Sequence, residues 1–123
     1  MLSTTHNRAY TDFLTLLTNF GSLVVDSHEQ INCSLVKQEF QHLQQCFQEH
    51  IVDLDSKDIR SDLVPRWQSI QTEIKREFKL LTTDILFLAS ARQNTTQTKR
   101  RKSIGDRTTK LIGYCRILLN QEG

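Results

Sequence analysis

The residues with the chemistry of a metal site are His42, Cys46 and His50, which follow one another at intervals of four in a helical pattern. Imidazole and thiolate are ligands that Zn²⁺ uses in proteins. A helix rises about 1.5 Å per residue, however, so the two histidines lie about 12 Å apart and one ion could bind at most two of the three side chains. We therefore predict no metal site and interpret these residues as the solvent boundary of a buried apolar stripe.

No other set of side chains predicts catalysis. The sequence has no nucleophile–base–acid set, no glycine-rich phosphate loop and no paired-carboxylate site. Glu73 and Glu77 form a like-charged pair, as do Lys75 and Lys79, and such pairs are typical of a solvated or partner-facing helix surface. We expect no enzyme activity, no catalytic residues and no cofactor.

Three cysteines, Cys33, Cys46 and Cys115, form an odd set without C-x-x-C spacing, which favours reduced thiols in a cytoplasm. The longest strongly apolar block, Ile85 to Ala89, is far shorter than the roughly 20 residues that cross a bilayer. The first residues lack the features of a secretory signal. We therefore expect a cytoplasmic protein without a membrane span.

Positive charge is concentrated near the C-terminal end. Residues 1–91 hold 8 Lys+Arg against 12 Asp+Glu, whereas residues 92–123 hold 8 against 2. Five of these cations are predicted to form a partner-binding surface, which we call the basic tip: Arg92, Lys99, Arg100, Arg101 and Lys102. Three interpretations remain open for it: a solvated basic end without a partner, docking onto an acidic protein, and contact with nucleic-acid phosphates. Nucleic acid ranks lower because no reading helix or aromatic platform accompanies the charge.

Composition and apolar periodicity predict an all-α antiparallel bundle of about four helices in one domain over residues 1–123. The first helix begins at Ser3 or Thr4, and its predicted apolar stripe consists of Tyr10, Phe13, Leu17, Phe20 and Val24. It ends within residues 21–29, either at Gly21-Ser22 or before a capping box at Asp26-Ser27. The second helix ends near Val52. Its predicted apolar stripe consists of Ile31, Leu35, Val36, Phe40, Leu43, Phe47 and Ile51.

Residues 53–62 predict a solvated, mobile loop, because they are rich in Asp and Ser and have no apolar period. Asp62 is the predicted N-cap of a third helix of about thirty residues, with Pro65 in its first turn. Its apolar stripe consists of Trp67, Ile70, Ile74, Phe78, Leu81, Ile85 and Leu88. A fourth helix has a stripe of Ile104, Thr108, Leu111, Cys115 and Leu118, widened by Ile112 and Leu119. The two stripes pair as an antiparallel hairpin whose turn falls at residues 94–97, within the polar stretch QNTTQT.

Asp84 is a lone carboxylate on a second apolar stripe of the third helix, which also includes Leu80, Phe87 and Ala91. This half of the helix must pack on two sides, against the fourth helix and against another helix, a second protomer or another protein. The hairpin alignment places Asp84 opposite Arg107. We predict a structural ion pair between them, because a buried carboxylate requires such a partner. An acidic contact point for a partner is the alternative.

The segments SIQTEIKREFKLLTTDILFLASARQNTTQTKRR and DRTTKLIGYCRILL resemble the heterocyst frequency control protein PatD family of cyanobacteria. The similarity is best over residues 67–119. It implies a small cytoplasmic helical protein that regulates cell division and heterocyst frequency by binding the tubulin-like division protein FtsZ and modulating its assembly. The resemblance supplies no catalytic residues.

The leading hypothesis is thus a non-catalytic adaptor for a division protein. A homodimer through the second stripe is left open. The alternative is a small nucleic-acid-binding regulator that uses the basic tip. Reversing the charge of residues 99–102 is expected to preserve helicity and to weaken partner binding.

Overall fold

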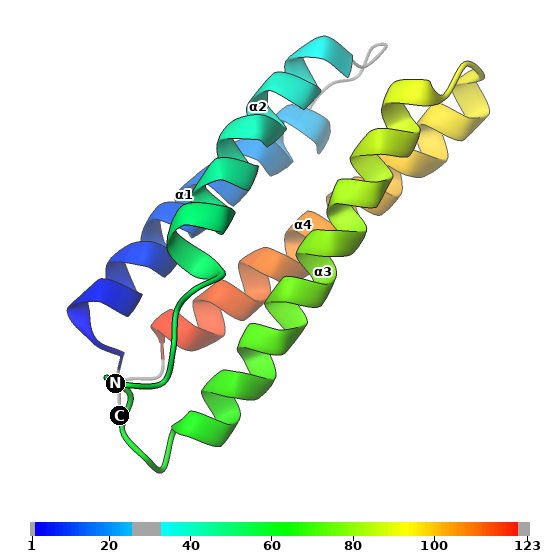
Figure 1. The fold of residues 1–123 in the computed structure, drawn as a ribbon. Helices are drawn as coiled ribbons and strands as arrows, with labels where there is room; N and C mark the ends of the chain where they lie inside the picture. Colours follow the sequence, from blue (N-terminus) through cyan, green and yellow to red (C-terminus); the bar gives the residue numbers. More distant parts are fainter. Residues whose placement is uncertain (1, 26–32, 121–123) are drawn as a thin grey trace.

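The computed structural model describes residues 2–25 and 33–120, excepting the side chains of Val25 and Asn94. The all-α prediction is confirmed: the described residues form four α-helices and a short π-helix, with no strand. In chain order these are α1 (Thr4–Val25), α2 (Cys33–Cys46), the π-helix (Phe47–Ile51), α3 (Val64–Ser90) and α4 (Asn94–Leu119). Figure 1 shows α3 and α4 as the long C-terminal hairpin.

The four α-helices surround one apolar core. Helix α1 packs against both α2 and α4, and α3 packs along α4 (Figure 1). Phe78 connects α3 to α2 and to the π-helix. Its ring stacks on that of Phe47 with 4.0 Å between centroids and on that of Phe40 with 5.5 Å. The predicted stripes of α1, α3 and α4 are buried, except that Ile70, Ile112 and Leu119 are only partly covered. In α2 the prediction that Leu35 is buried is wrong, because that side chain is 39% exposed.

Helix α1 is continuous through Gly21-Ser22, so the predicted break there is wrong. Gly21 lies where α1 approaches α4, and a Cβ added to it would lie 3.4 Å from Thr108 Cγ2, so this glycine serves close helix packing and does not end the helix. The alternative break at Asp26-Ser27 lies outside the described residues, as does Ile31. At the other end, Ser3 Oγ accepts a hydrogen bond from the His6 backbone N–H at 3.1 Å, which is N-cap geometry.

The segment between the π-helix and α3 is solvated in most positions, but it is attached to the bundle. Ile59 is buried in the core. The buried His6 lies with Nε2 2.8 Å from the Asp55 carbonyl oxygen, so Nε2–H is the donor in the neutral ring. The prediction of a solvated loop missed this anchoring because a single isoleucine among polar residues shows no periodicity.

Helix α3 has Leu63 rather than Asp62 as its N-cap, with no side-chain capping bond, and Pro65 lies in the first turn as predicted. The Asp62 carboxylate is occupied instead by Arg60, whose Nε and Nη2 donate to its two oxygens at 2.6 and 2.8 Å. A bidentate arginine pair is a stronger use of the carboxylate than one backbone N–H.

The predicted hairpin turn at residues 94–97 is also wrong. Helix α3 ends at Ser90, and Asn94 already begins α4. The polar residues taken for a turn form the exposed first turn of α4, where Gln97 donates from its side chain to the Ala91 carbonyl oxygen at 3.0 Å. Polar residues suit an exposed helix end as well as a turn, so composition alone did not distinguish the two.

A buried hydrogen-bond chain joins α1, the π-helix and α3. Trp67 Nε1 donates to Tyr10 Oη at 2.9 Å, and Tyr10 donates to Gln71 Oε1 at 2.7 Å. Gln71 Nε2 in turn donates to the carbonyl oxygen of Ile51 at 2.8 Å, at the end of the π-helix. A side chain of α3 thus satisfies a carbonyl at that helix end, which fixes the position of α3 relative to α1.

The three cysteines are free thiols, as expected, and Cys115 is fully buried. Burial, with a smaller effect of nearby Cys46, raises the pKa of Cys115 to about 12. Its folded-state pKa exceeds the value of about 8.5 for an exposed thiol, so its contribution to stability is complete below that pH and is lost as pH rises toward 12.

We therefore predict that the free energy of unfolding falls above pH 9, with Cys115 contributing about 1.4 kcal/mol per pH unit. Urea unfolding at pH 8, 9 and 10 measures this dependence. The Cys115→Ala variant should lose that part of the slope, whatever its stability at pH 8. An unchanged slope in the variant would show that another group titrates.

Candidate functional site

Two carboxylates of α3 and three side chains of α4 form an ionic cluster inside the hairpin. Asp84 and Glu77 are only 4% and 2% exposed. Arg107 Nε and Ser103 Oγ both donate to Asp84 Oδ2 at 2.7 Å, and Arg100 Nη1 donates to Oδ1 at 3.1 Å. Arg107 Nη1 also donates to Glu77 Oε2 at 3.2 Å. The predicted Asp84–Arg107 ion pair is therefore present, as one part of a larger network.

Glu77 is the member of this cluster that sequence reasoning missed. Its like-charged pairing with Glu73 predicts a solvated or partner-facing surface, but only Glu73 is substantially exposed, with 41% of its side chain accessible against 3% for Glu77. Glu77 is rotated by about 40° around the helix axis relative to Glu73, because four residues make slightly more than one turn. This rotation is enough to place Glu77 in the contact with α4. The nearby cations Arg76 and Lys110 lie 3.6 and 3.9 Å from its carboxylate.

The electrostatics of the cluster favour its charged form. Burial alone lowers the pKa of Arg107, but hydrogen bonds and charges from Asp84 and Glu77 outweigh that effect and raise the pKa above its usual value. Arg107 therefore remains protonated while it compensates two buried carboxylates. These side chains are engaged with one another, so the arrangement serves to hold α3 and α4 in one register.

The basic tip lies in the second turn of α4 and in the preceding connection, and its five cations divide into two groups. Arg92, Lys99 and Lys102 are exposed. Arg100 is bound to Asp84, and Arg101 Nε donates at 2.7 Å to the carbonyl oxygen of Val24, one of the last carbonyls of α1. A cation at a helix C-terminus is favourable there.

Reversing all four charges of residues 99–102, which is predicted to preserve helicity, would also disturb contacts between the helices. Glutamate at position 100 would face the Asp84 carboxylate, and glutamate at position 101 would face the C-terminal end of α1. Both contacts would become repulsive. Charge reversal at Arg92, Lys99 and Lys102 alone tests the basic tip without breaking these two contacts.

Helix α3 also exposes two large apolar side chains beside the basic tip. Leu86 is 61% exposed and Phe87 is 49% exposed. The guanidinium carbon of Arg100 lies 4.5 Å from the centroid of the Phe87 ring, a cation–π contact. In the predicted second stripe, Asp84 faces α4, whereas Phe87 is left half-exposed by the described helices of the chain. A second protomer or another protein stays open as the second contact of this half of α3.

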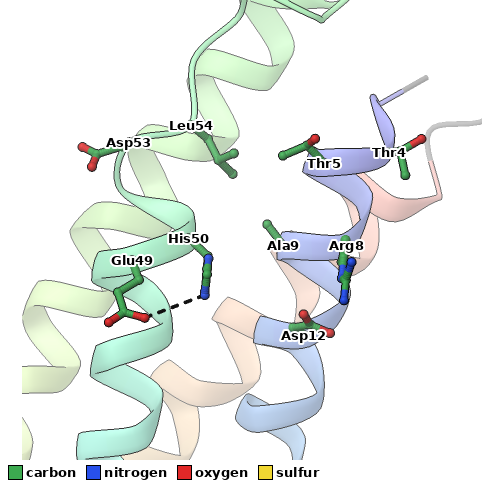
Figure 2. A pocket seen from close by; sticks show the side chains of 9 residues that line it. All are labelled: Thr4, Thr5, Arg8, Ala9, Asp12, Glu49, His50, Asp53 and Leu54. Carbon is green, nitrogen blue, oxygen red and sulfur yellow. Dashed lines mark ion pairs between the residues drawn. The ribbon is translucent and has the colours of Figure 1, made fainter.

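An open groove of about 650 Å³ lies between the start of α1 and the end of the π-helix with the residues that follow it (Figure 2). Its charged lining consists of Arg8, Asp12, Glu49 and Asp53, all exposed. Glu49 lies 3.9 Å from Nε2 of His50, also exposed, as the dashed line in Figure 2 shows. The groove combines residues that are far apart in the sequence, so no linear motif indicated it. Its open, mostly acidic lining offers weak attraction for cations.

The side chains of His42, Cys46 and His50 do not point to one common site. Cys46 is buried, whereas His42 and His50 are exposed. Within the described residues, no group of three or more His, Cys, Asp or Glu side chains is arranged to hold a metal ion. None of the helices in the same part of the chain has the length and apolar character needed to cross a bilayer.

No protein-family model, curated protein or solved structure matches this chain. The function is therefore argued from the geometry of the hairpin and from the resemblance carried by residues 67–119.

Proposed function

We propose that this chain is a non-catalytic cytoplasmic regulator that binds the division protein FtsZ through its basic tip and modulates FtsZ assembly. Control of heterocyst frequency would follow from that effect on division. The choice of partner rests on the resemblance to the PatD family. The observation that supports this mode of action is the exposure of Arg92, Lys99 and Lys102 at one end of the α3–α4 hairpin.

The hairpin suits such a role because its buried charges are paired with one another. The buried acids are neutralised by Arg100 and Arg107. The remaining cations of the tip, Arg92, Lys99 and Lys102, are exposed to solvent. FtsZ-type proteins are acidic, and complementary charge accelerates encounter and orients the partners. The ionic cluster holds α4 against α3 and thereby fixes the backbone positions from which these cations project, which limits the backbone entropy lost on binding.

The test is co-sedimentation of the purified protein with FtsZ polymers at several salt concentrations. The Arg92→Glu, Lys99→Glu, Lys102→Glu triple variant is expected to lose about tenfold or more in affinity at low salt, because attraction becomes repulsion. The matched control is Lys37→Glu, Lys57→Glu, Arg66→Glu, which changes the net charge equally at exposed positions elsewhere. That control should bind nearly as the parent protein does.

Equal loss in both triple variants would mean that net charge, and not the basic tip, governs binding. Absence of co-sedimentation by the parent protein would remove FtsZ as the partner. Binding of double-stranded DNA near physiological salt, with affinity falling steeply as salt rises, would favour the nucleic-acid alternative instead.

A further inference from the structure

The outward side of the last three turns of α3 carries no charged side chain. Residues 80–91, LLTTDILFLASA, contain a single ionisable residue, Asp84, and that carboxylate is buried against α4. The exposed surface of this segment is therefore built from uncharged side chains alone. A charge-free exposed face of this length is unusual on a surface helix, which normally directs charged residues to solvent.

Four residues define this surface, which we call the α3 outer face: Thr83, Leu86, Phe87 and Ser90. At 100° per residue, Thr83 and Ser90 lie between Leu86 and Phe87 on the side opposite the core. Their hydroxyls donate within the helix, Thr83 to the Lys79 carbonyl oxygen at 3.2 Å and Ser90 to the Leu86 carbonyl oxygen at 3.1 Å. The hydroxyl protons are thus already used, and the face presents mainly carbon to solvent.

Cations border this apolar face at both ends. Lys79 is exposed one turn before it, and Arg92 follows it directly. Along its side, Arg100 is held over the Phe87 ring by its ion pair with Asp84. The described part of the chain places no exposed carboxylate within the segment between Lys79 and Arg92. An apolar centre with a positive border is therefore the recognition chemistry of this surface.

We infer that the α3 outer face binds an amphipathic helical segment of a partner protein, with large apolar side chains at the centre and carboxylates at its edges. This inference rests on the proposed function, because it takes the partner that binds the basic tip to contact the α3 outer face as well. It specifies the chemistry of that partner. Apolar anchors in such a segment contact Leu86 and Phe87, and its acids contact Lys79 and Arg92. Three helical turns span about 16 Å, so two or three anchors fit.

Charge selects this occupant over a second copy of the chain. A two-fold dimer through the same face would place the same patch of both protomers in contact. The cations at the border of one patch would then lie against the cations of the other. Like charges directly opposed across an interface disfavour association. An acidic segment instead neutralises the border while it covers the apolar centre.

The experiment is an NMR titration of the full ¹⁵N-labelled chain with two synthetic helical peptides. Both have Leu or Phe at positions i, i+4 and i+7; one has Glu at the flanking positions and the other has Lys. The acidic peptide is expected to shift amide signals of residues 79–102 and the basic peptide to shift none. The Leu86→Ser, Phe87→Ser variant should bind the acidic peptide about tenfold more weakly, because it loses the apolar anchors.

The matched control is Ile117→Ser, which removes a 41% exposed apolar side chain from α4 and should bind as the parent does. Shifts outside residues 79–102, equal binding by the double variant, or no binding of the acidic peptide would overturn the inference. So would preference for anionic phospholipid vesicles over the peptide, or concentration-dependent dimerisation that the double variant abolishes.

The same variants separate this inference from the proposed function. If FtsZ binding depends on the basic tip but is unchanged in Leu86→Ser, Phe87→Ser, the proposed function stands and the inference fails. If FtsZ does not bind while the acidic peptide binds the α3 outer face, the inference stands and the identity of the partner changes.

Discussion

The Phe78→Ala variant is expected to lose about 3–5 kcal/mol of unfolding free energy. Phe78 is 3% exposed, and its ring contacts the rings of Phe13, Phe40 and Phe47 at centroid distances of 6.0, 5.5 and 4.0 Å. These partners come from α1, α2 and the π-helix. Truncation therefore leaves a cavity at the point where α3 meets the first half of the chain.

A loss of this size is a large part of the about 5–15 kcal/mol that stabilises a typical domain. Urea unfolding followed by circular dichroism measures it. The control on the same helix is Phe87→Ala, which removes a half-exposed ring and should cost less than about 1 kcal/mol, mainly the contact with Arg100. Similar losses in the two variants would show that the aromatic stack does not join α3 to the rest of the bundle.

The Arg107→Leu variant is expected to lose about 3 kcal/mol, because it leaves two buried carboxylates without their shared cation. This figure lies at the lower end of the range for a broken buried pair. The Arg107 side chain is 26% exposed, and Arg100 still contacts Asp84. The loss is measured by urea unfolding at neutral pH. Arg116→Leu, at an exposed position of the same helix, should change stability by less than about 0.5 kcal/mol.

A second variant distinguishes a cost of uncompensated charge from a cost of lost packing. Replacing Glu77, Asp84 and Arg107 together by leucine removes the charges along with their partner and is expected to recover most of the stability. If this triple variant is as unstable as Arg107→Leu alone, the loss of stability comes from side-chain packing between α3 and α4 and not from unbalanced charge.

The sequence by itself determined the helical class and most of the core, because these depend on local periodicity. Apolar residues at intervals of three and four identify a buried helix face wherever its partner lies. The stripes from Tyr10 to Val24 and from Trp67 to Leu88 are predicted in this way. Asp84 was likewise recognisable as needing a cation, since it is the only acid in an apolar segment.

The sequence did not determine how α3 and α4 are aligned. Two stripes with the same repeat pair well at several offsets, so the choice among them depends on the turn and on contacts between distant side chains. The connection falls at residues 91–93, which places Asp84 beside Arg100 and Ser103. Arg107 reaches Asp84 as well because its side chain is long, so the predicted pair formed despite the error in the turn.

Only the tertiary structure decided which charged and apolar side chains face solvent. Helix–helix contact buries Glu77 and turns Arg100 and Arg101 inward, whereas it leaves Leu86 and Phe87 exposed. No residue type carries that information, because exposure is set by the angle at which a neighbouring helix crosses and by where it ends. The candidate binding surface is therefore a property of how the hairpin is assembled, while the helices that form it are properties of the chain.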